Sequence, residues 1–170
     1  IGGFAAASFK RGIKCINIPT TLLGAVDAAV GGKTGINFNG LKNEIGAFAP
    51  AETVLIDSAF FKSLDHQNFL SGYAEMIKHG LIDSDKEWLA TMSFDTEEID
   101  YEKLKQLVVD SVAVKERIVE IDPFEKGIRK ALNLGHTIGH AFESMSYELN
   151  KHVQHGYAVA WGIICELYLS

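Results

Sequence analysis

Residues 129–143 read RKALNLGHTIGHAFE, in which polar side chains recur at intervals of four and three. At helical periodicity one face carries all of these polar residues: Arg129, Asn133, His136, His140 and Glu143. Two histidines four positions apart on a helix can bind one metal ion, and Gly135 and Gly139 beside them permit close approach of a backbone or a ligand. The segment therefore predicts a helix with a metal-binding face. The alternative is a polar surface stripe that contains two histidines.

The segments that surround this helix follow helical patterns as well. Apolar residues at helical spacing predict helices near residues 58–63, 66–81, 84–93, 100–121, 130–148 and 155–169. The pattern changes near Asp57, because glycine and proline are frequent before this residue and sparse after it. We therefore expect a mainly α protein, with an α/β part over residues 1–57 and an all-helical domain over residues 58–170.

The first part has the short elements of an α/β fold. We expect helices over residues 4–11 and 19–30, short strands over residues 14–18, 36–38 and 53–56, and a turn at Asn39-Gly40. Residues 31–35 (GGKTG) predict a tight loop. The spacing of this loop does not match the phosphate-binding loop of nucleotide-binding proteins, and the chain has no Gly-x-Gly-x-x-Gly motif.

A metal site needs ligands beyond the histidines of residues 129–143. His155 opens the last predicted helix, and Glu75 lies on the helix predicted over residues 66–81, with Lys78 on the same face. One carboxylate with neutral imidazoles suits zinc and leaves a position open for substrate oxygens. The alternatives are a surface ion pair for Glu75 and Lys78, and a helix end that faces water for His155.

Lys115 interrupts an apolar stripe on the helix predicted over residues 100–121. A lysine at such a position either extends its ammonium to solvent, which is the usual outcome, or is buried with a partner. Further basic and amide side chains accompany it in a protein of net charge −6: Arg11, Lys33, Lys42, Asn43, Lys78 and Arg129. Together they predict a pocket for the phosphate and carboxylate groups of a small molecule.

The composition argues against several classes of protein. A net charge of −6 disfavours nucleic acid as a partner, because binding to its phosphates needs a cationic surface. No apolar run approaches the length of a membrane span, so we expect no membrane partner. Cys15 and Cys165 lie far apart and form no Cys-x-x-Cys motif, which favours free thiols and a cytoplasmic location.

Several motifs, in their order along the chain, resemble the 3-dehydroquinate synthase family. The resemblance covers essentially the whole chain and rests on residues 19–27 (PTTLLGAVD), 31–37 (GGKTGIN), 42–48 (KNEIGAF), 72–78 (GYAEMIK), 129–141 (RKALNLGHTIGHA) and His155-Gly156. It implies that residues 1–57 are the C-terminal part of an α/β NAD-binding domain. It also implies that residues 58–170 are a helical metal- and substrate-binding domain, truncated at its C-terminus.

The resemblance implies roles for individual residues. Zinc, or cobalt in its place, would be held by Glu75, His136 and His155. Substrate binding would fall to Arg11, Lys33, Lys42, Asn43, Arg129 and Asn133, with Arg11 lent to the neighbouring subunit of a homodimer. NAD would contact Asp27 and Lys42. Catalytic roles would fall to Lys78, Lys115, His140 and Glu125, the last two in proton movement near a leaving phosphate.

The implied activity belongs to the shikimate pathway. It converts 3-deoxy-D-arabino-heptulosonate 7-phosphate to 3-dehydroquinate and phosphate through transient oxidation by NAD, phosphate elimination, re-reduction and intramolecular aldol closure. The alternatives are a sugar-phosphate cyclase of the inosose or valiolone type, a metal-dependent polyol dehydrogenase, and a helical metal-binding module without enzymatic activity. We expect the 170-residue chain alone to be inactive, because it lacks a glycine-rich turn for the NAD pyrophosphate.

Overall fold

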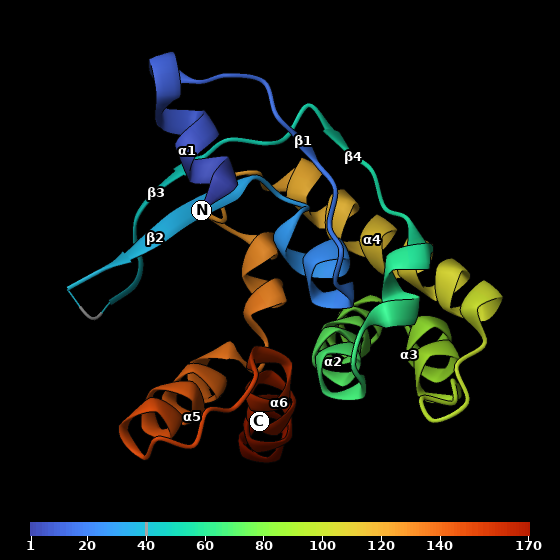
Figure 1. Ribbon diagram of the computed structural model, residues 1–170. Helices are drawn as coiled ribbons and strands as arrows, with labels where there is room; N and C mark the ends of the chain where they lie inside the picture. Colours follow the sequence, from blue (N-terminus) through green and yellow to red (C-terminus); the bar gives the residue numbers. More distant parts are fainter. Residues whose placement is uncertain (40) are drawn as a thin grey trace.

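The computed structural model describes residues 1–39 and 41–170, so the glycine of the turn predicted at Asn39-Gly40 lies outside the described residues. The protein is mainly α, as predicted, with two small sheets in the first part of the chain (Figure 1). The elements after Asp57 are η3 (Ser58–Ser63), α2 (His66–Asp83), α3 (Asp85–Met92), α4 (Tyr101–Ile121), η4 (Ile128–Asn133), α5 (His136–Glu148) and α6 (His155–Leu169). Among the described residues, no helix is long and apolar enough to cross a membrane.

Side-chain caps fix where α2, α3 and α4 begin. Asp65, Ser84 and Asp100 each accept a hydrogen bond from a backbone N–H in the first turn of the helix that follows. These N–H groups have no partner within the helix, so each cap stabilises it by about 1 kcal/mol. The bounds predicted for these helices from apolar spacing agree closely with the structure, and each predicted start lies within one residue of its cap.

α2 occupies the centre of the helical part and packs against α3, α4 and α6 (Figure 1). Its buried side chains form a hydrophobic core with neighbours from η3 and α4: Phe61, Phe69, Tyr73, Met76, Leu104 and Val108. Leu22, Ala25 and Val26, which lie before Asp57, belong to the same core. The first part of the chain therefore packs directly on α2 and α4, and the domain boundary at Asp57 stays a prediction.

The elements before Asp57 are α1 (Gly2–Ser8), η1 (Phe9–Arg11), β1 (Ile16–Asn17), η2 (Gly24–Ala28), β2 (Lys33–Phe38), β3 (Leu41–Phe48) and β4 (Thr53–Val54). β1 and β4 pair in parallel, and β2 and β3 form an antiparallel hairpin against which α1 lies (Figure 1). β2 begins inside the loop predicted over residues 31–35, so that loop is shorter than predicted. β3 was not predicted because all of its residues are exposed, and no buried face imposes an alternating pattern.

The helix predicted over residues 130–148 is interrupted, and this part of the prediction is wrong. η4 ends at Asn133 and α5 begins at His136. Between them Gly135 has a φ of 79°, where a Cβ would also lie 2.6 Å from the carbonyl oxygen of Val159 in α6. The close approach of α6 therefore sets the break, and Arg129 and Asn133 do not share a helical face with His136.

Three glycines hold α6 in backbone contact with α5 and α2. A Cβ on Gly139 would lie 2.9 Å from the carbonyl oxygen of Ala158. A Cβ on Gly162 would overlap the carbonyl oxygen of Gly135, and one on Gly156 would overlap that of Ser71 in α2. We call Gly139, Gly156 and Gly162 the glycine seam. Since no side chain separates the backbones at these contacts, the glycine seam fixes the spacing of α2, α5 and α6.

Gly162→Ala is expected to destabilise the protein by about 1–3 kcal/mol, because the added methyl forces α5 and α6 apart. Urea-induced unfolding measures this change. Gly2→Ala in α1 is the control, since nothing lies within 4 Å of the added Cβ and the change should be neutral or slightly stabilising. Equal stability of Gly162→Ala and wild type would contradict the contact.

Candidate metal centre

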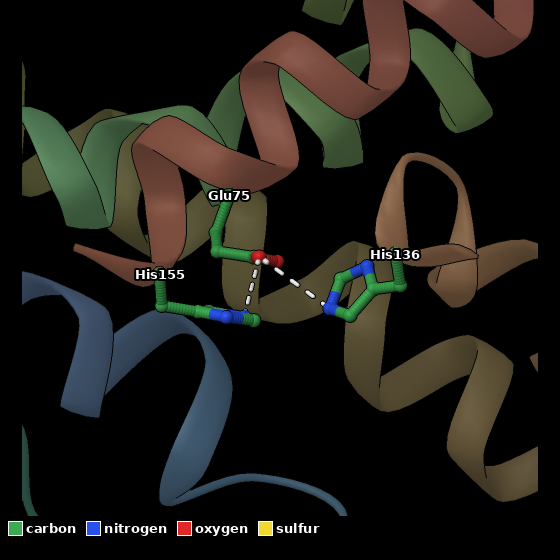
Figure 2. Close-up of side chains that lie close together, drawn as sticks. All are labelled: Glu75, His136 and His155. Atoms are coloured by element: carbon green, nitrogen blue, oxygen red, sulfur yellow. Dashed lines mark ion pairs between the residues drawn. The ribbon is translucent and has the colours of Figure 1, made fainter. Parts of the chain in front are cut away.

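Glu75, His136 and His155 converge from three helices (Figure 2). Glu75 is fully buried in α2, and the two histidines are the first residues of α5 and α6. Nε2 of His136 lies 3.8 Å from Oε1 of Glu75, and Nε2 of His155 lies 3.5 Å from the same oxygen. The glycine seam thus brings together three side chains that are far apart in the sequence.

The Glu75 carboxylate shows that this group fits a cation. Its Oε1 is buried and, among the described residues, makes no hydrogen bond, whereas Oε2 accepts one from the buried Lys78. Burial raises the pKa of Glu75, but the charges of Lys78 and the facing histidines outweigh burial, and the net pKa lies below its usual range. A charged oxygen without a partner and two facing imidazole nitrogens match the donors that zinc prefers.

Backbone and side-chain groups orient His136 at the start of α5. Its Nδ1 lies 3.3 Å from the carbonyl oxygen of Leu134, which leaves Nε2 directed toward Glu75. α5 has no side-chain cap of its own. Instead, Glu166 of α6 accepts hydrogen bonds from the backbone N–H of Gly135 at 2.7 Å and of Ile138 at 3.3 Å. Glu166 therefore caps the helix that carries His136.

The two histidines differ in their affinity for protons. Burial lowers the pKa of His136, so this ring is neutral at neutral pH. The facing carboxylate of Glu75 raises the pKa of His155 despite its burial. A proton on His155 therefore competes with a cation for the space in front of Glu75.

A cavity of about 380 Å³ opens beside this group. Its lining includes most of the residues that the sequence indicated: Asp27, Lys33, Asn43, Lys78, Lys115, Glu125, Arg129, Asn133, His136, His140 and His155. Glu75 lies behind the lining and is fully buried. Within the described chain, Arg11 and Lys42 stand outside the lining: Arg11 is exposed at the end of η1, and Lys42 binds Glu143.

Lys115 is buried with a partner, which was the less common of the two predicted outcomes. Its Nζ lies 2.5 Å from both the carbonyl oxygen and Oδ1 of Asp27. Burial lowers the pKa of Lys115. Burial raises the pKa of Asp27, but the charges of Lys115 and Lys78 and the hydrogen bond from Lys115 together outweigh it, and the net pKa is lowered. The charged pair ties η2 to α4 at the wall of the cavity.

Lys115→Met is expected to destabilise the protein by about 1–3 kcal/mol, because it leaves the Asp27 carboxylate, whose side chain is 31% exposed, without a counter-charge. Lys115→Met with Asp27→Asn should recover most of this loss, since no unpaired charge remains. Urea unfolding of the wild type, both single variants and the double variant measures the coupling. A double variant as unstable as Lys115→Met would argue against the pair.

Glu125 and Arg129 organise the rest of the cavity wall. Glu125 pairs with Lys33 and accepts a hydrogen bond from Nδ2 of Asn133 at 2.6 Å. The buried Arg129 guanidinium donates to the carbonyl oxygens of Pro123 at 2.7 Å and Gly31 at 2.8 Å. Arg129 therefore holds the loop before β2 against the segment after α4, with its positive charge at the cavity.

His140 does not join His136 at Glu75, so the predicted pairing of these two histidines on one ion is not what the structure shows. His140 instead belongs to a second group with Glu143 and His155. The sequence placed Glu143 on the same helical face as His140, and α5 confirms this, but the pattern assigned Glu143 no role. Glu166 gave no sequence signal at all, because it lies 31 residues from Gly135.

Comparison with known proteins gives matches along the whole chain. The family model for the 3-dehydroquinate synthase N-terminal part matches residues 1–71, and the model for the C-terminal part matches residues 72–170. A 3-dehydroquinate synthase from Parabacteroides distasonis is 65% identical over 170 residues, which is 100% of this chain and 48% of that protein. The chain spans about half the length of the curated relatives it matches.

Solved structures of sugar-phosphate cyclases have the same fold. A 2-deoxy-scyllo-inosose synthase complexed with carbaglucose-6-phosphate, NAD⁺ and Co²⁺ is 29% identical, has a TM-score of 0.85, and matches over 95% of this chain and 44% of that chain. A 2-epi-5-epi-valiolone synthase from Streptomyces hygroscopicus subsp. jinggangensis 5008, with NAD⁺ and Zn²⁺ bound, is 27% identical, has a TM-score of 0.79, and matches over 95% and 45%.

Proposed function

The chain belongs to the 3-dehydroquinate synthase family, and we propose that its protein converts 3-deoxy-D-arabino-heptulosonate 7-phosphate to 3-dehydroquinate and phosphate. The observation that carries this proposal is a single cavity in which cationic side chains lie beside the group of Glu75, His136 and His155. A substrate with one carboxylate, one phosphate and neighbouring hydroxyl groups needs both features.

We propose that Glu75, His136 and His155 hold a divalent metal, zinc or cobalt, and that Asp27 contacts NAD. When bound, the metal supplies a Lewis acid and NAD supplies reversible hydride transfer. The NAD⁺, Co²⁺ and Zn²⁺ in the two cyclase structures support this set of cofactors. Lys42 was also predicted to contact NAD. It binds Glu143 and lies outside the cavity lining, so its contact with NAD stays a prediction, whereas Asp27 lines the cavity.

The residues of this chain would bind and orient the substrate. Lys33, Lys78, Lys115 and Arg129 supply positive charge for its two anionic groups, and Asn43 and Asn133 supply amides for its hydroxyl groups. Fixed charges around a bound substrate lower the barrier mainly by positioning and by electrostatic stabilisation. Burial lowers the pKa of His140, so this imidazole is neutral at neutral pH and can accept a proton beside the leaving phosphate.

We also propose a homodimer that works in the cytoplasm and in which Arg11 reaches the cavity of the neighbouring subunit. Arg11 is exposed, lies outside the cavity lining of its own chain and has a φ of 69° at the end of η1. These features suit a residue that points away from its own site.

Phosphate release by the intact protein tests the proposed activity. We expect release from the heptulosonate phosphate that needs both NAD and a divalent metal, and that stops when a chelator removes the metal. No release from this substrate under any of these conditions would contradict the proposal.

A cyclase of the inosose or valiolone type is the second candidate, because the two solved structures described above are of these enzymes. These two enzymes are 29% and 27% identical to this chain, against 65% for the 3-dehydroquinate synthase from Parabacteroides distasonis. Turnover of glucose 6-phosphate, whose carba analogue is named in the inosose synthase complex, without turnover of the heptulosonate would favour this candidate.

A further inference from the structure

Glu143 is a buried carboxylate that contacts a proposed metal ligand but is not itself aimed at the metal position. Its side chain is 7% exposed, and Oε1 lies 3.2 Å from Nδ1 of His155. The other ring nitrogen of His155, Nε2, lies 3.5 Å from Oε1 of Glu75. His155 therefore lies between two carboxylates, one on each of its ring nitrogens.

The group of His140, Glu143 and His155 has the spacing of a second metal site, but the ammonium of Lys42 already pairs with its carboxylate. Nζ of Lys42, from β3, lies 2.7 Å from Oε2 of Glu143. A metal ion there would have to displace this ammonium, and it would take the Nδ1 of His155 that faces Glu143. The Lys42 ion pair also offsets the cost of burying the Glu143 charge.

We infer that Glu143 is a positioning residue that fixes the ring orientation and tautomer of His155. A carboxylate at Nδ1 favours the tautomer with its proton on that nitrogen, so the lone pair of Nε2 faces Glu75. The ring of His136 is oriented in the same way by the backbone carbonyl of Leu134, and no side-chain substitution removes that carbonyl. Glu143 is thus the position where this orientation can be tested by mutation. The inference rests on the metal centre proposed above.

The contact with Lys42 extends this role to the hairpin of β2 and β3. Lys42 precedes Asn43, which lines the cavity with a φ of 53° and donates its backbone N–H to Oδ1 of Asn37. Glu143 therefore connects the first part of the chain to the first residue of α6. The Glu143 carboxylate thus contacts His155, a proposed metal ligand, and also Lys42 of β3, the strand that carries Asn43.

Zinc affinity of the metal-free intact protein, measured in competition with a chromophoric chelator, tests the inference. Glu143→Ala is expected to bind zinc about 10–100-fold more weakly, because partners behind a ligand contribute this much to affinity. Glu143→Gln keeps an acceptor but not the charge and should fall between Glu143→Ala and wild type. Glu148→Gln, an exposed glutamate on the same helix, is the control and should bind zinc like wild type.

A combined variant separates positioning from a general loss of structure. In a His155→Ala background, Glu143→Ala should cause no further loss of zinc affinity, because the ring it orients is gone. A further tenfold loss in that background would overturn the inference, as would zinc binding by Glu143→Ala within twofold of wild type. If Glu143→Ala does not fold, the zinc affinity of Glu143→Gln is measured instead, and binding within twofold of wild type would overturn the inference. A wild type that binds no zinc would overturn the proposed metal centre together with this inference.

Discussion

His136→Ala is expected to remove the bound metal and, with it, the activity. The histidine supplies one of the three proposed ligands, and its Nε2 lies 3.8 Å from Oε1 of Glu75, a buried oxygen that makes no hydrogen bond among the described residues. Zinc affinity should fall more than about 100-fold, since even residues behind a ligand contribute 10–100-fold. The rate of phosphate release should fall at least as steeply, because a metal's stabilisation of charge is worth several kcal/mol.

Elemental analysis of the purified variant and wild type measures the bound metal. His152→Ala is the matched control, because this exposed histidine lies just before α6 and contacts the ring of Tyr147 rather than Glu75. It should retain metal and activity. Equal metal content in His136→Ala and wild type would remove His136 from the centre.

Lys78→Met is expected to produce a protein whose stability depends on metal. Lys78 and Glu75 form an ion pair in which the side chains are 1% and 0% exposed. Without metal, the variant leaves the Glu75 carboxylate as an unpaired buried charge, which should cost about 3–5 kcal/mol. Added zinc restores a positive charge at the carboxylate, so most of this loss should be recovered when the metal is bound.

Thermal unfolding with a chelator and with zinc compares the two conditions. Lys86→Met, at an 88% exposed side chain on α3, is the control and should change little in either condition. Glu75→Gln should also be destabilised, because it leaves Lys78 buried without a partner, but zinc should not rescue it. A loss of stability in Lys78→Met that is unchanged by zinc would argue against a metal at Glu75.

The sequence predicts the helical part better than the first part for identifiable physical reasons. α2 and α4 have apolar stripes and caps at Asp65 and Asp100, both of which are local signals. β3 has eight exposed residues and therefore no alternation. The break at Gly135 depends on the approach of Val159 in α6, and no local pattern records a contact with a distant helix.

The same distinction applies to the site. Helical spacing associated His136 with His140, and residue types on other predicted helices indicated Glu75 and His155 as further candidate ligands. The resemblance to the family then implied Glu75, His136 and His155 as one set, and the structure places these three side chains together. Lys115 could be predicted as unusual because it interrupts an apolar stripe, but its partner Asp27 lies 88 residues away. Lys42 and Glu143 are 101 residues apart, so their ion pair follows only from the packing of the hairpin against α5.

The glycine seam has a consequence for engineering the substrate range. α2, α5 and α6 meet at backbone contact, so a library that varies residues along this seam would consist mostly of destabilised proteins. β2 and β3 reach the same cavity with Lys33 and Asn43, and all the residues of β3 are exposed. Directed evolution toward a new sugar phosphate should therefore vary the hairpin and keep the three helices constant.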